Sequence, residues 1–142
     1  MIIQLIPITN AHSSSQLPTR LLGLSCGFPS PADDYQDAPI DLHQHLIKRP
    51  SATYFAWANG DSLADLGIFN GDLLVVDRSL EAKHGDVVVA SIDGQLCCKV
   101  LDLNQRQLRA ANGAYAAIAI ADDLDVLIEG VVIHAIHHLR ND

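Results

Sequence analysis

The stretch DVVVASIDGQLCCKVLDL, residues 86–103, decides the fold. Its first part, Asp86–Ile92, is rich in valine, a residue that favours strands. Asp93-Gly94 follows, and this pair accepts the positive φ angles of a two-residue hairpin turn. Gln95–Leu103 then forms the return strand, so the sequence predicts an antiparallel hairpin at this place.

More short strands are predicted on both sides of the hairpin. They are Thr53–Ala58, Leu73–Asp77, Arg106–Ala110 and Val126–Leu139. A short helical turn, Leu63–Ile68, follows the first of them, and Gly130 is expected to bend the last. Short strands separated by Gly and Asp turns are typical of a mainly β, antiparallel and partly closed fold with one or two short helices.

The first fifty residues have a different character. Residues 1–26 carry one charge, Arg20, and we expect them to form a partly extended arm. Residues 27–40 hold three prolines, which favour extended backbone. A short helix is then expected from Asp41 to Arg49, with Asp41 as its N-cap. The predicted organisation is therefore an arm (1–26), an extended linker with a short helix (27–50) and a β domain (51–142).

Composition narrows the possible classes of protein. Of the 142 residues, 49% are hydrophobic, which excludes a largely disordered chain. The net charge, 9 − 17 = −8, disfavours binding to DNA phosphates. No apolar run reaches the roughly 18 residues of a membrane helix, so we expect no membrane contact. Three cysteines without a C-x-x-C pair favour a reducing cytoplasm, and we expect neither a cofactor nor a metal site.

The histidines near the C-terminal end of the chain are the one pattern that suggests a metal. His134, His137 and His138 form an H-x-x-H-H sequence. In a strand, His134 and His138 share a face while His137 points to the other side. The three residues therefore read more simply as the solvated end of a strand than as a set of ligands.

Ser62 can be interpreted in two ways. It stands in Asn59-Gly60-Asp61-Ser62-Leu63, between a strand and a helical turn. A serine in this place is commonly the N-cap of the turn. Alternatively it is a nucleophile beside backbone N–H groups that stabilise an oxyanion. The local sequence favours the cap and leaves the second reading open.

Lys99 can also be interpreted in two ways. Period-two alternation puts it on one face with Cys97 and Leu101, between apolar neighbours. One possibility is a lysine at a sheet edge, with its stem on the core and its ammonium in water. The other is a buried lysine, since burial disfavours the charged form. A neutral lysine accepts the proton of a serine hydroxyl in serine–lysine catalysis.

Several motifs occur together in one order along the chain. They are Cys26-Gly27-Phe28-Pro29-Ser30-Pro31-Ala32, Pro50–Phe55, Gly60-Asp61-Ser62, Gly71–Asp77, His84-Gly85-Asp86 and Val131–His134. With them the chain resembles the UmuD-like branch of the LexA-like self-cleaving serine–lysine peptidases, from about Cys26 to Ala135. The resemblance implies that Ser62 is the nucleophile and Lys99 the general base. It also implies that the Cys26–Gly27 bond is cleaved and that the backbone N–H groups of Ser62 and Asp61 hold the oxyanion.

The resemblance further implies a role in the SOS response. UmuD-like proteins are homodimers that cleave themselves when stimulated by the RecA–single-stranded DNA filament. Their shortened form joins a UmuC-like Y-family polymerase in error-prone translesion synthesis. The long apolar strand Val126–Leu139 is an expected dimer contact, unless it lies inside the sheet.

Departures from the family pattern keep other functions open. Asn59 and Leu63 stand where the family usually has Ser and Met, and residues 1–25 match poorly. A catalytically silent module that binds a polymerase or the RecA filament is therefore an alternative. A repressor that binds DNA is disfavoured by the charge of −8 and by the lack of a helix-turn-helix before the linker.

Overall fold

The computed structural model describes residues 2–6, 21–22, 35–36, 39–111, 116–121 and 125–141. The chain divides into two compact units. One, here called the sheet unit, comprises residues 1–8 and 49–142, and the other comprises residues 9–48. Within the described residues, no helix is long and apolar enough to cross a membrane.

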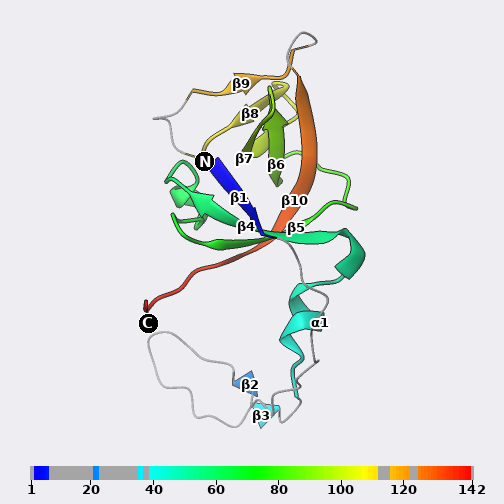
Figure 1. The fold of residues 1–142 in the computed structure, drawn as a ribbon, viewed down its shortest axis with the longest axis vertical. Coiled ribbons are helices and arrows are strands. Elements are labelled where there is room, and N and C mark those ends of the chain that lie inside the picture. The colour runs from blue at the N-terminus through cyan, green and yellow to red at the C-terminus, as the bar shows by residue number, and fades with distance from the viewer. Residues whose placement is uncertain are drawn as a thin grey trace. The chain divides into compact units, whose positions relative to one another are not determined.

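The sheet unit is built on one antiparallel sheet of eight strands (Figure 1). The strands are β1 (Ile2–Ile6), β4 (Thr53–Asn59), β5 (Leu73–Asp77), β6 (Val87–Ile92), β7 (Gln95–Asp102), β8 (Gln107–Arg109), β9 (Ile118–Ala119) and β10 (Val126–Ile136). Their order in space is β1-β4-β5-β10-β6-β7-β8-β9. One further pair, Ile2 with Cys97, joins β1 to β7. The predicted mainly β, antiparallel, partly closed fold is confirmed.

The hairpin that the sequence predicted is present. Val87–Ile92 pairs antiparallel with Gln95–Val100, and Ile92 lies opposite Gln95. Asp93 and Gly94 have φ angles of 50° and 83°, as a two-residue turn with positive φ requires. The pairing places Val88 opposite Lys99.

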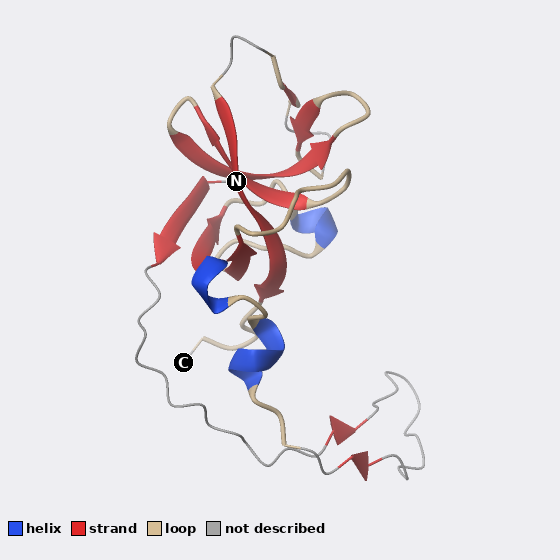
Figure 2. Cartoon of the chain, turned by 90° about the vertical axis from the view of Figure 1, so that its right-hand side faces the viewer, coloured by secondary structure: helices blue, strands red, loops and turns tan. Residues whose placement is uncertain are grey.

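Helices are few and short (Figure 2). In residues 9–48, α1 (Leu42–Leu46) begins after Asp41, whose carboxylate accepts a hydrogen bond from the Gln44 N–H at 3.3 Å. The predicted cap is confirmed, but the helix stops before Arg49 because Ile47 has extended backbone. The same unit holds the paired strands β2 (Leu21–Leu22) and β3 (Tyr35–Gln36). The 3₁₀ turns η1 (Pro50–Ala52) and η2 (Ala64–Leu66) belong to the sheet unit.

Two groups of buried residues form the core of the sheet unit. The first, called core 1, contains Ile3, Ala56, Ala58, Leu63, Ile68, Leu74, Val76, Val89, Cys98 and Val100. The second contains Val88, Ala90, Leu101, Leu108 and Val131. The side chains are nearly all aliphatic and small or medium in size, as the low aromatic content of 5% requires. Core 1 includes Leu63, so it fixes the residue that follows Ser62.

Strand β10 is bent, as the sequence predicted at Gly130. Its register with β6 shifts between Ile128 and Gly130. Contrary to the expectation of a strand edge open for dimer contact, β10 lies inside the sheet, between β5 and β6. It pairs with β6 over residues 126–131 and with β5 over residues 131–136, so each of its edges is used within the chain along part of its length.

Asp77, at the end of β5, is a fully buried carboxylate. It accepts hydrogen bonds from the Ser79 N–H (2.8 Å), the Ser79 hydroxyl (2.6 Å) and the Arg49 Nη1 group (3.0 Å). Burial by itself raises the pKa of Asp77, but these hydrogen bonds and the Arg49 charge together lower the pKa below its usual value. The carboxylate form therefore stabilises the fold.

This arrangement predicts a dependence of stability on pH. Because the pKa is lower in the folded state than in the unfolded state, the stabilisation is present above the unfolded pKa of about 4. It is lost as the pH falls through the folded pKa. We expect Asp77→Asn to lower the free energy of unfolding at pH 7 by about 2 kcal/mol, measured by urea denaturation.

The control is Asp65→Asn, which changes an exposed carboxylate. We expect the Asp77→Asn chain to lose less stability between pH 7 and pH 3 than the natural chain, and the Asp65→Asn chain to match the natural one. If the Asp77→Asn chain loses as much stability between pH 7 and pH 3 as the natural chain does, this account of Asp77 is wrong.

Candidate active site

Ser62 lies in the loop that leaves β4, three residues beyond Asn59. Its side chain is buried, and within the described part of the chain its Oγ has no hydrogen-bond partner. The following 3₁₀ turn has Leu63 as its N-cap residue, with no capping side-chain hydrogen bond. The reading of Ser62 as an N-cap is therefore wrong. A buried hydroxyl without a partner costs stability, which makes a functional role the better explanation.

Contacts on both sides hold the Ser62 loop in place. The Gly60 N–H donates to the side-chain oxygen of Asn70 at 2.9 Å, and the Ala111 N–H donates to the Ser62 carbonyl at 2.9 Å. Gly60 has a φ of 111°, a conformation that glycine adopts without strain. Neither Asn70 nor Ala111 was predicted as a contact of this loop, although the Asn70-Gly71-Asp72 sequence signals the turn that carries Asn70.

A buried carboxylate organises that turn. Asp72 accepts a hydrogen bond from the Phe69 N–H at 2.8 Å, and its other oxygen lies 2.6 Å from Nδ1 of His137. The rings of Phe69 and His137 also contact, with centroids 5.0 Å apart. His137 is thus paired rather than simply solvated, which corrects the interpretation of the strand end. In the described residues no three His, Cys, Asp or Glu side chains form a group that could hold a metal.

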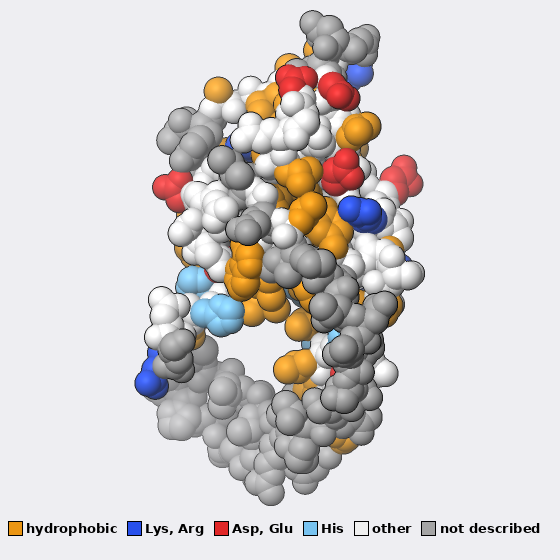
Figure 3. Space-filling model, in the orientation of Figure 1, with side chains coloured by type: hydrophobic (Ala, Val, Ile, Leu, Met, Phe, Trp, Pro, Cys, Tyr) orange, Lys and Arg blue, Asp and Glu red, His pale blue; other side chains and the backbone are white. Residues whose placement is uncertain are grey.

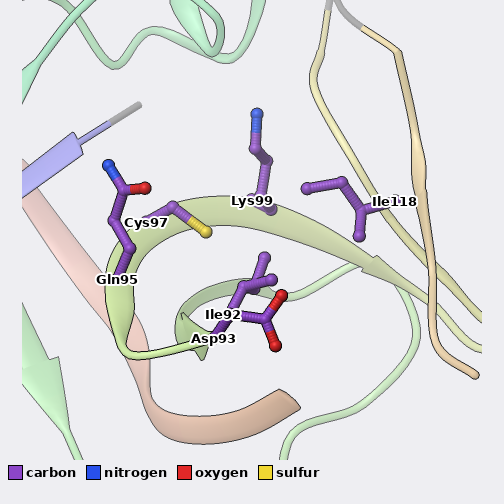
Figure 4. Close-up of a pocket in the computed structure, with 6 residues that line it drawn as sticks. All are labelled: Ile92, Asp93, Gln95, Cys97, Lys99 and Ile118. Atoms are coloured by element: carbon purple, nitrogen blue, oxygen red, sulfur yellow. The ribbon is translucent and has the colours of Figure 1, made fainter. Parts of the chain in front are cut away.

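Lys99 lies on β7, in the interior of the sheet. Its exposed fraction is 7%, so the reading of an edge lysine with its ammonium in water is wrong. It lines a cavity of about 360 Å³ together with Ile92, Asp93, Gln95, Cys97 and Ile118. Figure 4 shows its amino group pointing away from the Asp93 carboxylate. The face shared by Gln95, Cys97 and Lys99 agrees with the predicted alternation.

The cysteines beside Lys99 are poor nucleophiles. Burial raises the pKa of the Cys97 thiol, against the opposing effect of the positive charge of Lys99. Burial raises the pKa of Cys98 to about 12. Both thiols are therefore protonated at neutral pH, and the reactive form of cysteine is the thiolate. Ser62 therefore stays the candidate nucleophile.

Two links in the sheet connect the surroundings of Ser62 to those of Lys99. Ile2 of β1 lies opposite Asn59 on one side and opposite Cys97 on the other. The Ser62 carbonyl is bonded to Ala111, just beyond β8, and β8 pairs with β7 through Arg109 and Val100. Core 1 also holds Leu63 together with Cys98 and Val100. The flanks of both residues are thus parts of one packed region.

The other predicted site residues fall in two places. Asp61 and Ser62, the expected backbone donors to the oxyanion, both stand between β4 and η2. Cys26 and Gly27, the expected cleavage site, lie outside the described residues. Their roles stay predictions, as does the pairing of Ser62 with Lys99.

Comparison with known proteins identifies the family. Residues 21–133 match the model of the family described as Peptidase S24-like. Protein MucA of Escherichia coli is 39% identical over 138 residues, which cover 96% of this chain and 94% of MucA. Protein ImpA of Salmonella typhimurium is 43% identical over 114 residues, covering 80% of this chain and 79% of ImpA.

A further relative agrees with these two. Protein SamA of Salmonella typhimurium is 41% identical over 116 residues, covering 81% of each chain. The family match covers well over half of the sequence and includes the Ser62 loop and Lys99. The chain therefore belongs to the Peptidase S24-like family, among its UmuD-like members.

Proposed function

We propose that this chain is a self-cleaving serine peptidase of the SOS response, with Ser62 as nucleophile and Lys99 as general base. It cuts its own Cys26–Gly27 bond in the cytoplasm when a RecA–single-stranded DNA filament stimulates it. The processed form then serves as a subunit of an error-prone translesion polymerase with a UmuC-like protein. The observation that carries the proposal is the buried Ser62 hydroxyl, which has no partner among the described residues and sits in a firmly held loop. Its neighbour Leu63 shares core 1 with Cys98 and Val100, the two neighbours of the buried Lys99.

The chemistry follows from these two side chains. Neutral Lys99 takes the proton of the Ser62 hydroxyl as Oγ attacks the carbonyl carbon of Cys26. The backbone N–H groups of Asp61 and Ser62 stabilise the negative oxygen that forms. Lys99 returns the proton to the amine of Gly27, which leaves. Water then hydrolyses the ester between Cys26 and Ser62.

The burial of Ser62 supports a reaction that is slow without a stimulus. Its exposed fraction is 1%, so a peptide carbonyl reaches Oγ only after the site opens. The chain between Gly27 and Ser62 is 62 − 27 = 35 residues long and reaches about 100 Å when extended. This length permits cleavage within one subunit and cleavage between two.

Homodimer formation is part of the proposal, and we assign it to the exposed face of β10. Leu127 and Ile128 on this strand have exposed fractions of 57% and 41%. In Figure 3, hydrophobic side chains gather across the middle of the face shown. Covering such side chains with the same surface of a second copy is the common route to a twofold dimer.

The position of the cut tests the proposed function. We expect the chain incubated at about pH 10, where more lysine is neutral, to be converted slowly into residues 27–142. An activated RecA filament at neutral pH is expected to give the same product. Intact mass and N-terminal sequencing identify Gly27 as the first residue. The product has a charge of −9, since the arm removes one positive charge, Arg20.

Two other outcomes contradict parts of the proposed function. A different new N-terminus contradicts the assignment of Cys26–Gly27. A chain that stays whole under both conditions supports the alternative, a silent module that only binds its partners.

A further inference from the structure

Strand β1 is an integral part of the sheet. Over residues 2–6 it pairs with β4, from Ile2 opposite Asn59 to Ile6 opposite Phe55 (Figure 1). Ile3 is buried, with an exposed fraction of 7%, and belongs to core 1 with Ala58 and Leu63. In the strand order of the sheet β1 comes first, so it covers the outer edge of β4.

The same strand lies in the segment that the proposed cleavage releases. Before the cut, a covalent connection keeps β1 at the millimolar effective concentration typical of a tethered segment. After a cut between Cys26 and Gly27, residues 1–26 form a separate peptide that has to bind in trans. At micromolar protein concentration this change weakens occupancy of the β4 edge by roughly a thousandfold.

Loss of β1 leaves a defined surface behind. The backbone of residues 55–59 loses its partner strand, and an unpaired edge is a template for another extended segment. The place of the Ile3 side chain in core 1 is emptied, and the residue opposite it is the small, buried Ala58. The edge therefore offers main-chain hydrogen bonds together with one aliphatic pocket.

We propose that the β4 edge over residues 55–59 is a docking surface that processing opens for an extended segment of a partner protein. This inference rests on the proposed function. The partner segment pairs antiparallel, is uncharged like Ile2–Ile6, and places an aliphatic side chain where Ile3 lies. The charge of −9 on the processed chain disfavours an acidic segment.

The new N-terminal end of the processed chain is a poor occupant of this edge. Residues 27–39 contain Pro29, Pro31 and Pro39, each without a backbone N–H to donate. Proline within a strand also prevents regular pairing on a sheet. The surface is therefore expected to stay open until another protein covers it.

The test uses the full-length chain with Ser62→Ala and a foreign protease site placed at the Cys26–Gly27 bond. The foreign protease makes the cut, so the measurement does not depend on self-cleavage. The probe is a fluorescent peptide with the sequence of residues 1–16, whose polar second half keeps it in solution. We expect its fluorescence anisotropy to report binding to the cut chain, after removal of the released arm, at least tenfold tighter than to the uncut chain.

Two matched peptides test the pocket. Ile3 is buried and Leu5, two residues further along β1, has an exposed fraction of 45%. We expect the Ile3→Asp peptide to lose at least tenfold in affinity and the Leu5→Asp peptide to stay within about threefold. Amide hydrogen exchange of residues 55–59 is expected to rise on cutting and to fall again when the native peptide is added.

Several outcomes overturn the inference. They are equal binding to cut and uncut chains, no binding to the cut chain, and equal affinity of the two Asp peptides. The cut chain can also associate with itself, which light scattering detects. If this association protects residues 55–59 from amide hydrogen exchange, a second copy of the chain is the occupant and the inference of a partner protein is wrong. Failure of the natural chain to cleave itself contradicts the proposed function but not the docking surface. The two failures are distinguishable because the foreign protease, and not self-cleavage, makes the cut in this test.

Discussion

Ser62→Ala is expected to leave the Cys26–Gly27 bond intact under conditions that process the natural chain, with a loss of rate of roughly a thousandfold or more. The substitution removes the attacking oxygen and nothing else. Because the Ser62 hydroxyl is buried without a partner in the described residues, its loss is expected to leave the free energy of unfolding unchanged or to raise it by up to about 1 kcal/mol. Cleavage is followed by intact mass and stability by urea denaturation.

Lys99→Ala and Lys99→Arg are expected to be equally inactive. Alanine offers no base, and arginine keeps its proton at every accessible pH. The natural chain is expected to cleave faster as the pH rises, because only neutral lysine accepts a proton. The matched controls are Ser51→Ala and Lys83→Ala, both at exposed positions, and both are expected to cleave at the natural rate. Cleavage by folded Lys99→Ala at the natural rate and pH profile excludes Lys99 as the base.

Local patterns predicted the strands of the sheet well. Leu73–Asp77 has the predicted bounds, and the predicted Thr53–Ala58 extends by one residue to Asn59. The reason is that β-branched runs and Asp-Gly or Asn-Gly turns act over a few residues. The end of the last strand was placed too late, at Leu139 rather than Ile136, since the histidines that follow carry no stop signal.

Contacts between distant parts of the chain escaped the sequence analysis. The sequence predicts a partly extended arm over residues 1–26, but no local signal indicates that Ile2–Ile6 pairs with a strand some fifty residues later. The contact of His137 with Asp72 joins residues 65 positions apart. For Ser62, the local pattern favoured a cap, and only the structure excludes it. The resemblance of several ordered motifs, rather than periodicity, indicated Ser62 and Lys99 as a pair.

Gly130→Ala is expected to lower the free energy of unfolding by about 2–3 kcal/mol, measured by urea denaturation. Gly130 stands at the register shift of β10, where the strand crosses close to β5. A Cβ atom at this position meets the Val76 Cγ1 atom at 2.6 Å and the Asp77 carbonyl oxygen at 3.3 Å. Val76 is fully buried and Asp77 contributes backbone, so neither atom moves without disturbing the sheet.

Gly94→Ala is the matched control, because it separates steric overlap from backbone strain. Gly94 has a φ of +83°, but a Cβ atom there meets nothing within 4 Å. We expect this substitution to cost only about 1 kcal/mol, from the left-handed conformation alone. A third variant, Val76→Ala, shortens the opposing side chain and removes its Cγ1 atom. In this background Gly130→Ala is expected to lower the free energy of unfolding by at least about 1 kcal/mol less than it does in the natural chain. Additive costs for the two changes mean that overlap with Val76 is not the cause.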